Sequence, residues 1–130
     1  MMTKKEIKII RSALAQIKPK QLDMNTFGRM KLNGKIVACL AGHICLFQGY
    51  EMQDDEETGV SFRLKNSKLP PRKAHEIVKK LLKLSDKETD VLFYTCEWPE
   101  LFSFEYSDLR PRKRLEVLKS RVEHFINTGK

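Results

Sequence analysis

The residues best suited to chemistry lie in one uncharged segment, residues 36–50. Cys39 and His43 are four residues apart, so on a helix their side chains would share one face and could meet one metal ion. Zinc needs three or four ligands. The remaining candidate ligands show no paired C-x-x-C or H-x-x-x-H spacing; they are Cys45, His75, Cys96 and His124. We therefore favour core cysteines and a locally hydrogen-bonded His43 over the alternative of a metal site.

Catalysis by the same pair is the less favoured alternative. A cysteine nucleophile must be exposed to substrate and its thiolate stabilised by an electropositive setting, whereas this segment has the pattern of a buried helix. The chain has no glycine-rich phosphate loop, no Ser-His-Asp arrangement and no convincing carboxylate pair. The acids from Asp54 to Glu57 are consecutive and miss the alternate spacing of a calcium loop. We predict a non-enzymatic protein with no catalytic residue and no cofactor.

The uncharged segment is expected to form the most buried helix, over residues 36–48, because apolar residues occupy all of its sides. Gly49 is its expected C-terminal cap. A stripe of small side chains runs along it, namely Ala38, Ala41 or Gly42, and Cys45. Such a stripe would let another helix cross close to the backbone, which makes this helix the expected centre of the fold.

Other helices are indicated by their start and stop signals. Capping boxes at Thr3–Glu6 and Ser85–Glu88 begin two of them, Pro70-Pro71 opens another, and the last runs from near Asp108 or Pro111 to Gly129. Two features indicate turns or strands: Asn33-Gly34 in a connection that otherwise has the pattern of a loop, and the alternation of Val60, Phe62 and Leu64. The predicted fold is all-α: one compact domain over residues 1–130, with five or six helices and at most a minor hairpin.

Length and composition fit a single cytoplasmic domain. A chain of 130 residues can bury about two thirds of its unfolded surface around one core. Three cysteines cannot all pair, and the charged N-terminal segment lacks the features of a secretory signal. The uncharged segment, as a helix, would reach roughly 22 Å, short of the approximately 30 Å hydrocarbon layer. We therefore expect no membrane association, while the oligomeric state stays open.

The net charge of +8 alternates in sign from one segment to the next. Basic clusters on the first, third and last helices would bind nucleic acid without sequence preference if they shared one face. They are Lys4, Lys5, Lys8, Arg11, Arg72, Lys73, Lys79, Lys80, Arg110, Arg112, Lys113 and Arg114. If they point apart, each cluster is only a solvated surface. Nucleic-acid binding is therefore the alternative prediction.

The favoured prediction is a protein-binding module that uses an aromatic and acidic segment. Residues 93–106 hold six of the eleven aromatic side chains, and most of these are expected to pack in the core. Aromatic rings surrounded by acids also suit a protein interface. Trp98 and Tyr106 are the candidate anchors for an unidentified protein partner.

A longer pattern resembles small uncharacterised proteins of phages and bacterial mobile elements. It consists of Met24-Asn25-Thr26-Phe27, Ala38-Cys39-Leu40-Ala41-Gly42-His43, Leu81-Leu82-Lys83-Leu84, Leu92-Phe93 and Trp98-Pro99, and would cover roughly residues 22–126. The chain departs from the family pattern at Asn33-Gly34-Lys35, where Cys-Gly-Thr is usual, and at Lys83, where glycine is usual. The resemblance implies no activity. It implies a phage-like context, in which the protein would be a regulator or inhibitor of a host component.

Overall fold

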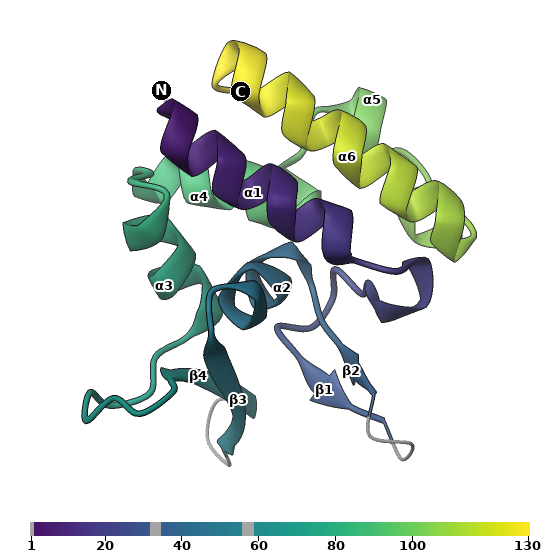
Figure 1. Cartoon of the computed structure of the whole chain (residues 1–130). Coiled ribbons are helices and arrows are strands. Elements are labelled where there is room, and N and C mark those ends of the chain that lie inside the picture. The colour runs from purple at the N-terminus through teal and green to yellow at the C-terminus, as the bar shows by residue number, and fades with distance from the viewer. Residues whose placement is uncertain (1, 32–34, 56–58) are drawn as a thin grey trace.

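The computed structural model describes residues 2–31, 35–55 and 59–130 (Figure 1). In this part of the chain there are six α-helices and two two-stranded antiparallel sheets, so the all-α prediction is wrong and the fold is mixed, though rich in helix. The helices are α1 Lys4–Gln16, α2 Leu40–Phe47, α3 Ala74–Leu81, α4 Asp86–Phe93, α5 Glu100–Ser103 and α6 Pro111–Thr128. Short 3-10 helices are η1 Pro19–Gln21, η2 Thr95–Glu97 and η3 Tyr106–Asp108. The strands are β1 Arg29–Met30, β2 Ile36–Val37, β3 Tyr50–Asp55 and β4 Gly59–Leu64.

The first hairpin corrects the predicted boundary of the buried helix. Ile36 and Val37 pair with Met30 and Arg29, and α2 begins only at Leu40. Ile36 and Val37 are β-branched residues, which fit a strand better than a helix because their χ1 freedom is restricted. The Asn33-Gly34 turn lies outside the described residues.

The second hairpin is longer than the minor strand expected from the sequence. Six residues of β3 pair with six of β4, from Tyr50 opposite Leu64 to Asp55 opposite Gly59. Phe62 is 1% exposed and faces the core, and it also pairs with Arg72 through backbone hydrogen bonds of 2.8 and 2.9 Å. The segment Tyr50–Asp55 is poor in β-formers, so its pairing comes from its neighbour rather than from its own sequence. The acidic turn residues 56–58 lie outside the described residues.

Helix α2 is the centre of the fold, as predicted. Leu40, Ala41, Ile44 and Cys45 are completely buried, and α1, α3 and β3 all contact this helix. Gly49, with φ +91°, follows its end as expected. The chain therefore folds around the segment that its hydropathy singles out.

The closest approach to α2 is made by a loop and not by a helix. A Cβ atom on Gly42 would lie 2.1 Å from the carbonyl oxygen of Phe27 and 2.8 Å from the Cβ of Ala38. Glycine is thus needed here because the backbone of the segment before β1 crosses directly over α2. The prediction that backbone packs closely against the small side chains of α2 is confirmed at Gly42, but the element that packs there is a loop and not the predicted helix. Near Cys45 a helix does approach: the thiol lies 3.8 Å from the carbonyl oxygen of Ala74 at the start of α3.

The capping boxes predicted at Thr3–Glu6 and Ser85–Glu88 and the cap at Gly129 are confirmed, but the predicted helix start at Pro70-Pro71 is wrong. Helix α3 begins only at Ala74, because the backbone of Arg72 is paired with Phe62. The Ser85 hydroxyl accepts from the Glu88 backbone N–H at 3.1 Å, and the Glu88 carboxylate accepts from the Ser85 N–H at 2.9 Å. Glu6 accepts from the Thr3 N–H at 3.1 Å, and Gly129 ends α6 with φ +71°. Each of these signals is local, so it works without knowledge of the tertiary fold.

The elements are arranged in layers around α2 (Figure 1). Helices α1 and α6 run antiparallel, and Arg11 of α1 donates two hydrogen bonds of 2.8 Å to Glu123 of α6. Both hairpins extend from the opposite side of α2. Between α4 and α6 the buried Arg121 donates to the carbonyl oxygen of Val91 at 2.7 Å. The 3-10 turn η1 lies beside the start of α6 and beside β2, and this junction forms the candidate site.

Candidate nucleic-acid interface

A groove lined mainly by cations lies between η1, the β1–β2 hairpin and the start of α6. The part lined by Arg110 and Arg112 has a volume of about 810 Å³. The part lined by Asp23 and Leu22, which we call the inner part because it adjoins these less exposed residues, has a volume of about 360 Å³, and Lys20, Lys31 and Val37 line both. We call the two parts together the basic groove. Its cations are Lys18, Lys20, Arg29, Lys31, Lys35, Arg110, Arg112 and Arg114. Among the described lining residues, Asp23 is the one acid.

Backbone contacts bring these distant segments together. Pro19 is the first residue of η1, and Pro111 is the first residue of α6, a position where the N–H that proline lacks would have no partner within the helix. The carbonyl oxygen of Gln21 accepts from the Ala38 N–H at 3.0 Å, and the Ala38 carbonyl accepts from the Asp23 N–H at 3.0 Å. The segment after η1 is thereby fixed to the root of β2. The part of the groove between η1 and β2 is therefore built on hydrogen-bonded backbone.

The charge of the groove is largely uncompensated. Arg29 lies 3.3 Å from the Asp23 carboxylate. Six other cations make no ion pair with any residue that the structure describes: Lys18, Lys20, Lys31, Arg110, Arg112 and Arg114. All six are exposed except Arg114, which is half-buried. A concave surface with one sign of charge raises the local concentration of counter-ions, so the charge of this groove is complementary to that of an anionic ligand.

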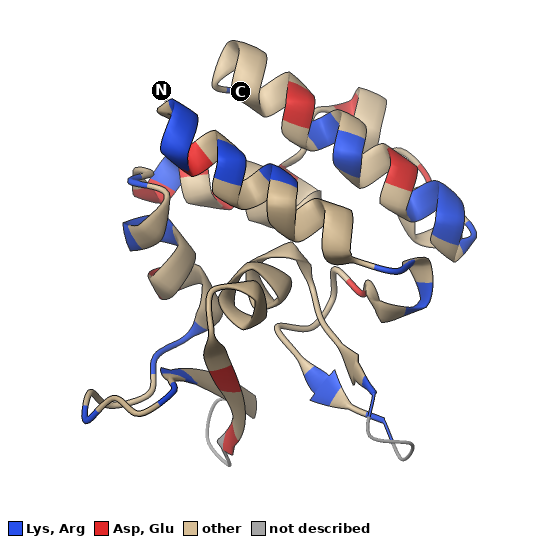
Figure 2. Cartoon of the chain, in the orientation of Figure 1, with Lys and Arg blue, Asp and Glu red and all other residues tan. Residues whose placement is uncertain are grey.

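The twelve basic residues predicted from the sequence do not share one face. Arg110, Arg112 and Arg114 line the groove, whereas the other clusters lie elsewhere (Figure 2). Lys4, Lys5, Lys8 and Arg11 are on α1. Arg72, Lys73, Lys79 and Lys80 are in and before α3, across the molecule from the start of α6. Three of the twelve are already in ion pairs: Arg11 with Glu123, Lys79 with Asp86, and Lys113 with Glu116.

Most of the groove was missed because its cations lie in a segment interpreted as loop. Between residues 18 and 35 the sequence has five bases and one acid; the bases are Lys18, Lys20, Arg29, Lys31 and Lys35. That local excess was a usable signal. Its convergence with Arg110 and Arg112, which are distant in sequence, was not visible in any local pattern.

The candidate protein-binding anchors are core residues. Trp98 is 4% exposed and Tyr106 is 7% exposed. Their rings form a T-shaped pair with centroids 5.2 Å apart, and the Trp98 indole N–H donates to the carbonyl oxygen of Leu92 at 2.9 Å. Neither ring is available to anchor a partner. The exposed apolar side chains of this segment are instead Leu101, 84% exposed, and Phe104, 68% exposed.

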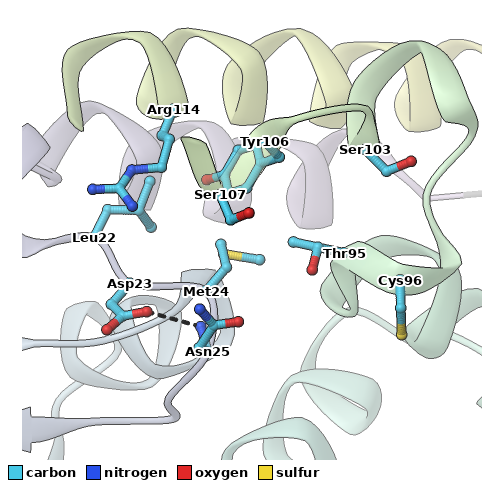
Figure 3. A pocket seen from close by; sticks show the side chains of 10 residues that line it. All are labelled: Leu22, Asp23, Met24, Asn25, Thr95, Cys96, Ser103, Tyr106, Ser107 and Arg114. Carbon is cyan, nitrogen blue, oxygen red and sulfur yellow. Dashed lines mark hydrogen bonds between the residues drawn. The ribbon is translucent and has the colours of Figure 1, made fainter. Parts of the chain in front are cut away.

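A smaller polar pocket of about 180 Å³ adjoins the inner part of the groove (Figure 3). We call it the polar pocket. Its lining residues are Leu22, Asp23, Met24, Asn25, Thr95, Cys96, Ser103, Tyr106, Ser107 and Arg114. Burial raises the pKa of the Tyr106 hydroxyl to about 12, so this group is a neutral phenol at physiological pH.

Cys39 is a buried core residue, and His43 is half-buried beside it. His43 Nε2 donates to the carbonyl oxygen of Gln21 at 2.7 Å, so its partner is 22 residues away rather than local. Burial lowers the pKa of His43 and raises the pKa of the Cys39 thiol to about 11, which keeps both groups neutral. Over the part of the chain that the structure covers, no three His, Cys, Asp or Glu side chains are grouped so as to hold a metal ion.

Comparisons with protein-family models, with curated proteins and with solved structures find no match. The resemblance to phage and mobile-element proteins thus stays a prediction. Within the described residues no helix has the length and apolar character needed to cross a membrane.

Proposed function

We propose that this protein is a non-enzymatic nucleic-acid-binding protein that holds the phosphate backbone in the basic groove. The observation that carries the proposal is the convergence of eight cations with one acid on a single concave surface. Each phosphate neutralised by a Lys or Arg releases about one condensed counterion, which drives binding without sequence preference. This keeps the alternative function expected from the sequence but moves it to a different set of residues.

The geometry of the groove suits a backbone contact better than a flat basic surface does. Arg112 and Arg114 lie in the first turn of α6 and Arg110 directly precedes it, while Lys18 and Lys20 come from η1 and the residue before it. Arg29 and Lys31 come from the β1–β2 hairpin, at or next to β1. A nucleic-acid strand that lies between these cations and those of η1 and α6 therefore has cations on both sides. Arginine guanidinium groups also bind phosphate in a bidentate way, which adds geometric selectivity.

The test is a binding titration with random-sequence DNA and RNA at about 50 and 200 mM salt. Six phosphate contacts predict a loss of on the order of a thousandfold in affinity between the two salt concentrations. The triple variant Lys18→Glu, Lys20→Glu, Arg112→Glu is expected to abolish measurable binding at the higher salt.

A matched control separates the groove from net charge. The triple variant Lys4→Glu, Lys5→Glu, Lys8→Glu reverses the same number of exposed charges on α1. It is expected to bind within about twofold of wild type at the higher salt, because charges beyond the Debye length of about 8 Å are largely screened. Equal losses in the two variants, or no binding by the wild-type protein at 50 mM salt, would contradict the proposal.

A second candidate function, a protein-binding regulator or inhibitor in a phage-like context, has a specific observation in its favour. Leu101 and Phe104 are the two large apolar side chains that α5 and the residue after it leave exposed, and the acids Glu100 and Glu105 flank them. This surface fits a partner with an apolar centre and a basic rim. A double variant, Leu101→Ser with Phe104→Ser, should lose a stoichiometric partner that the wild-type protein retains from the native host. Retention of the same partner by the variant argues against this surface.

A further inference from the structure

The polar pocket is continuous with the basic groove. Asp23, Asn25 and Arg114 line both the pocket and the inner part of the groove, as does Leu22. Figure 3 shows Arg114, Tyr106 and Ser107 on one side of the pocket and Asp23, Met24 and Asn25 on the other. A nucleic-acid strand that lies along the cations of the groove therefore passes the opening of this pocket.

Two polar groups of the pocket are buried and unsatisfied. Neither the hydroxyl of Tyr106, in a side chain only 7% exposed, nor Nε of Arg114 has a hydrogen-bond partner among the residues that the structure describes. Buried polar groups in folded proteins almost always have partners, so each exception calls for an explanation. A ligand with hydrogen-bonding atoms that enters the pocket would satisfy both groups.

The opposite wall limits which part of a nucleic acid could enter. The Asp23 carboxylate accepts from the Asn25 backbone N–H at 3.0 Å and faces the Arg29 guanidinium at 3.3 Å. A second anion beside this carboxylate is disfavoured by like charge. A nucleobase is neutral, and its edge carries both donors and acceptors that match the Asn25 amide, the Asp23 carboxylate and the Tyr106 hydroxyl.

The size of the pocket also fits one ring system. Its volume of about 180 Å³ is slightly above the approximately 150 Å³ of an engineered cavity that binds benzene. Met24 and Leu22 give it apolar surface, which suits the faces of a base. The walls thus combine apolar area with a few polar groups that converge, as is usual for small-ligand sites.

We propose that the polar pocket receives one unpaired base of a single-stranded nucleic acid whose backbone lies in the basic groove. The inference rests on the proposed function and adds a ligand class to it. A base that enters the pocket must be free of its complementary strand, so single strands are preferred over duplexes.

The test compares homopolymer oligonucleotides with a base-free chain of the same length, an oligomer of abasic deoxyribose phosphate. Oligo(dT), oligo(dA) and oligo(rU) are measured at one salt concentration, together with a matched duplex. For the wild-type protein the best single strand is expected to bind about tenfold more tightly than the base-free chain and than the duplex. The DNA and RNA arms show whether the ribose contributes.

Tyr106→Phe removes only the unpartnered hydroxyl. This variant is expected to bind the best single strand about fivefold more weakly while its affinity for the base-free chain is unchanged. Tyr50→Phe is the matched control, because Tyr50 lies on β3 and does not line the groove or the pocket. It should bind both chains like wild type, and thermal unfolding checks that both variants stay folded.

The outcomes separate the two proposals. If the wild-type protein binds the base-free chain as tightly as every single strand, and Tyr106→Phe has no effect, the pocket proposal is overturned while backbone binding in the groove stands. If the wild-type protein binds none of these chains at low salt, the proposed function itself fails.

Discussion

The two β-hairpins flank α2 and extend from the same side of the molecule, but they differ in charge and in attachment (Figures 1 and 2). The β1–β2 hairpin has two residue pairs and directs Arg29 and Lys31 into the basic groove. The β3–β4 hairpin has six pairs, carries Glu51 and Asp54 on β3, and inserts Phe62 into the core. The β1–β2 hairpin thus contributes side chains to the surface groove, whereas the β3–β4 hairpin contributes a side chain to the core.

The two hairpins are in contact through apolar residues close to α2, whereas their charged residues lie apart. A Cβ atom on Gly28, just before β1, would lie 2.6 Å from the Met52 sulfur of β3, so the apolar roots of the hairpins are in contact. Glu51 and Asp54 of β3 are not among the described residues that line the groove. These two acids therefore do not neutralise the cations of the basic groove by direct contact.

The largest difference between the hairpins is expected in their contribution to stability. Phe62→Ala should lower the free energy of unfolding by about 4 kcal/mol, because it leaves a cavity in the core. Met30→Ala on β1, where the side chain is 63% exposed, should change it by no more than about 0.5 kcal/mol. Urea denaturation of both variants measures the difference. Similar losses would mean that β1–β2 is also part of the core.

The junctions of the hairpins with α2 should also differ. Gly42→Ala is expected to cost about 3 kcal/mol, because the new methyl group would collide with the backbone of the segment leading to β1. In Gly49→Ala, between α2 and β3, the new methyl group would meet only the Leu64 side chain at 4.0 Å, but the residue must adopt a positive φ, which costs about 1 kcal/mol. Equal costs in urea denaturation would refute the close approach at Gly42.

A smaller, pH-dependent loss of folding stability is expected from Cys39, which lies between β2 and α2. Burial raises the pKa of Cys39 from 9.0 to about 11, so between these values the unfolded chain loses the thiol proton and the folded chain keeps it. Folding stability contributed by this group is complete below pH 9 and falls as pH rises toward 11. Unfolding free energies measured from pH 8 to 10.5 should show this fall. Cys39→Ala should show a less steep one, and parallel curves would contradict the assignment.

The smallest expected effect is on nucleic-acid affinity, and it compares charge reversal on the β1–β2 hairpin with charge reversal on the β3–β4 hairpin. Lys31→Glu should weaken binding of random single-stranded DNA about fivefold and reduce the slope of log affinity against log salt by about 1. Asp54→Lys alters charge by the same amount on the acidic hairpin and should change affinity by less than about twofold. If the two substitutions have opposite effects of equal size, net charge rather than the groove determines binding.

Local signals in the sequence determined the caps and the central helix. Ser85 with Glu88 fixes the start of α4, and Gly129 ends α6, because each needs only the residues within one helical turn. The apolar character of residues 40–47 was sufficient to predict burial of α2, since a helix without a polar face cannot remain in water.

Tertiary structure decided the sheets and the candidate site. The polar segment Tyr50–Asp55 becomes a strand only because β4 lies beside it. The burial of Trp98 and Tyr106 depends on how their rings meet, which an aromatic-rich sequence does not specify. The basic groove combines residues 18–35 with residues 110–114, and no periodicity or spacing within either segment encodes their meeting. Long-range convergence is set by packing around α2, so the groove and the polar pocket beside it exist only in the folded chain.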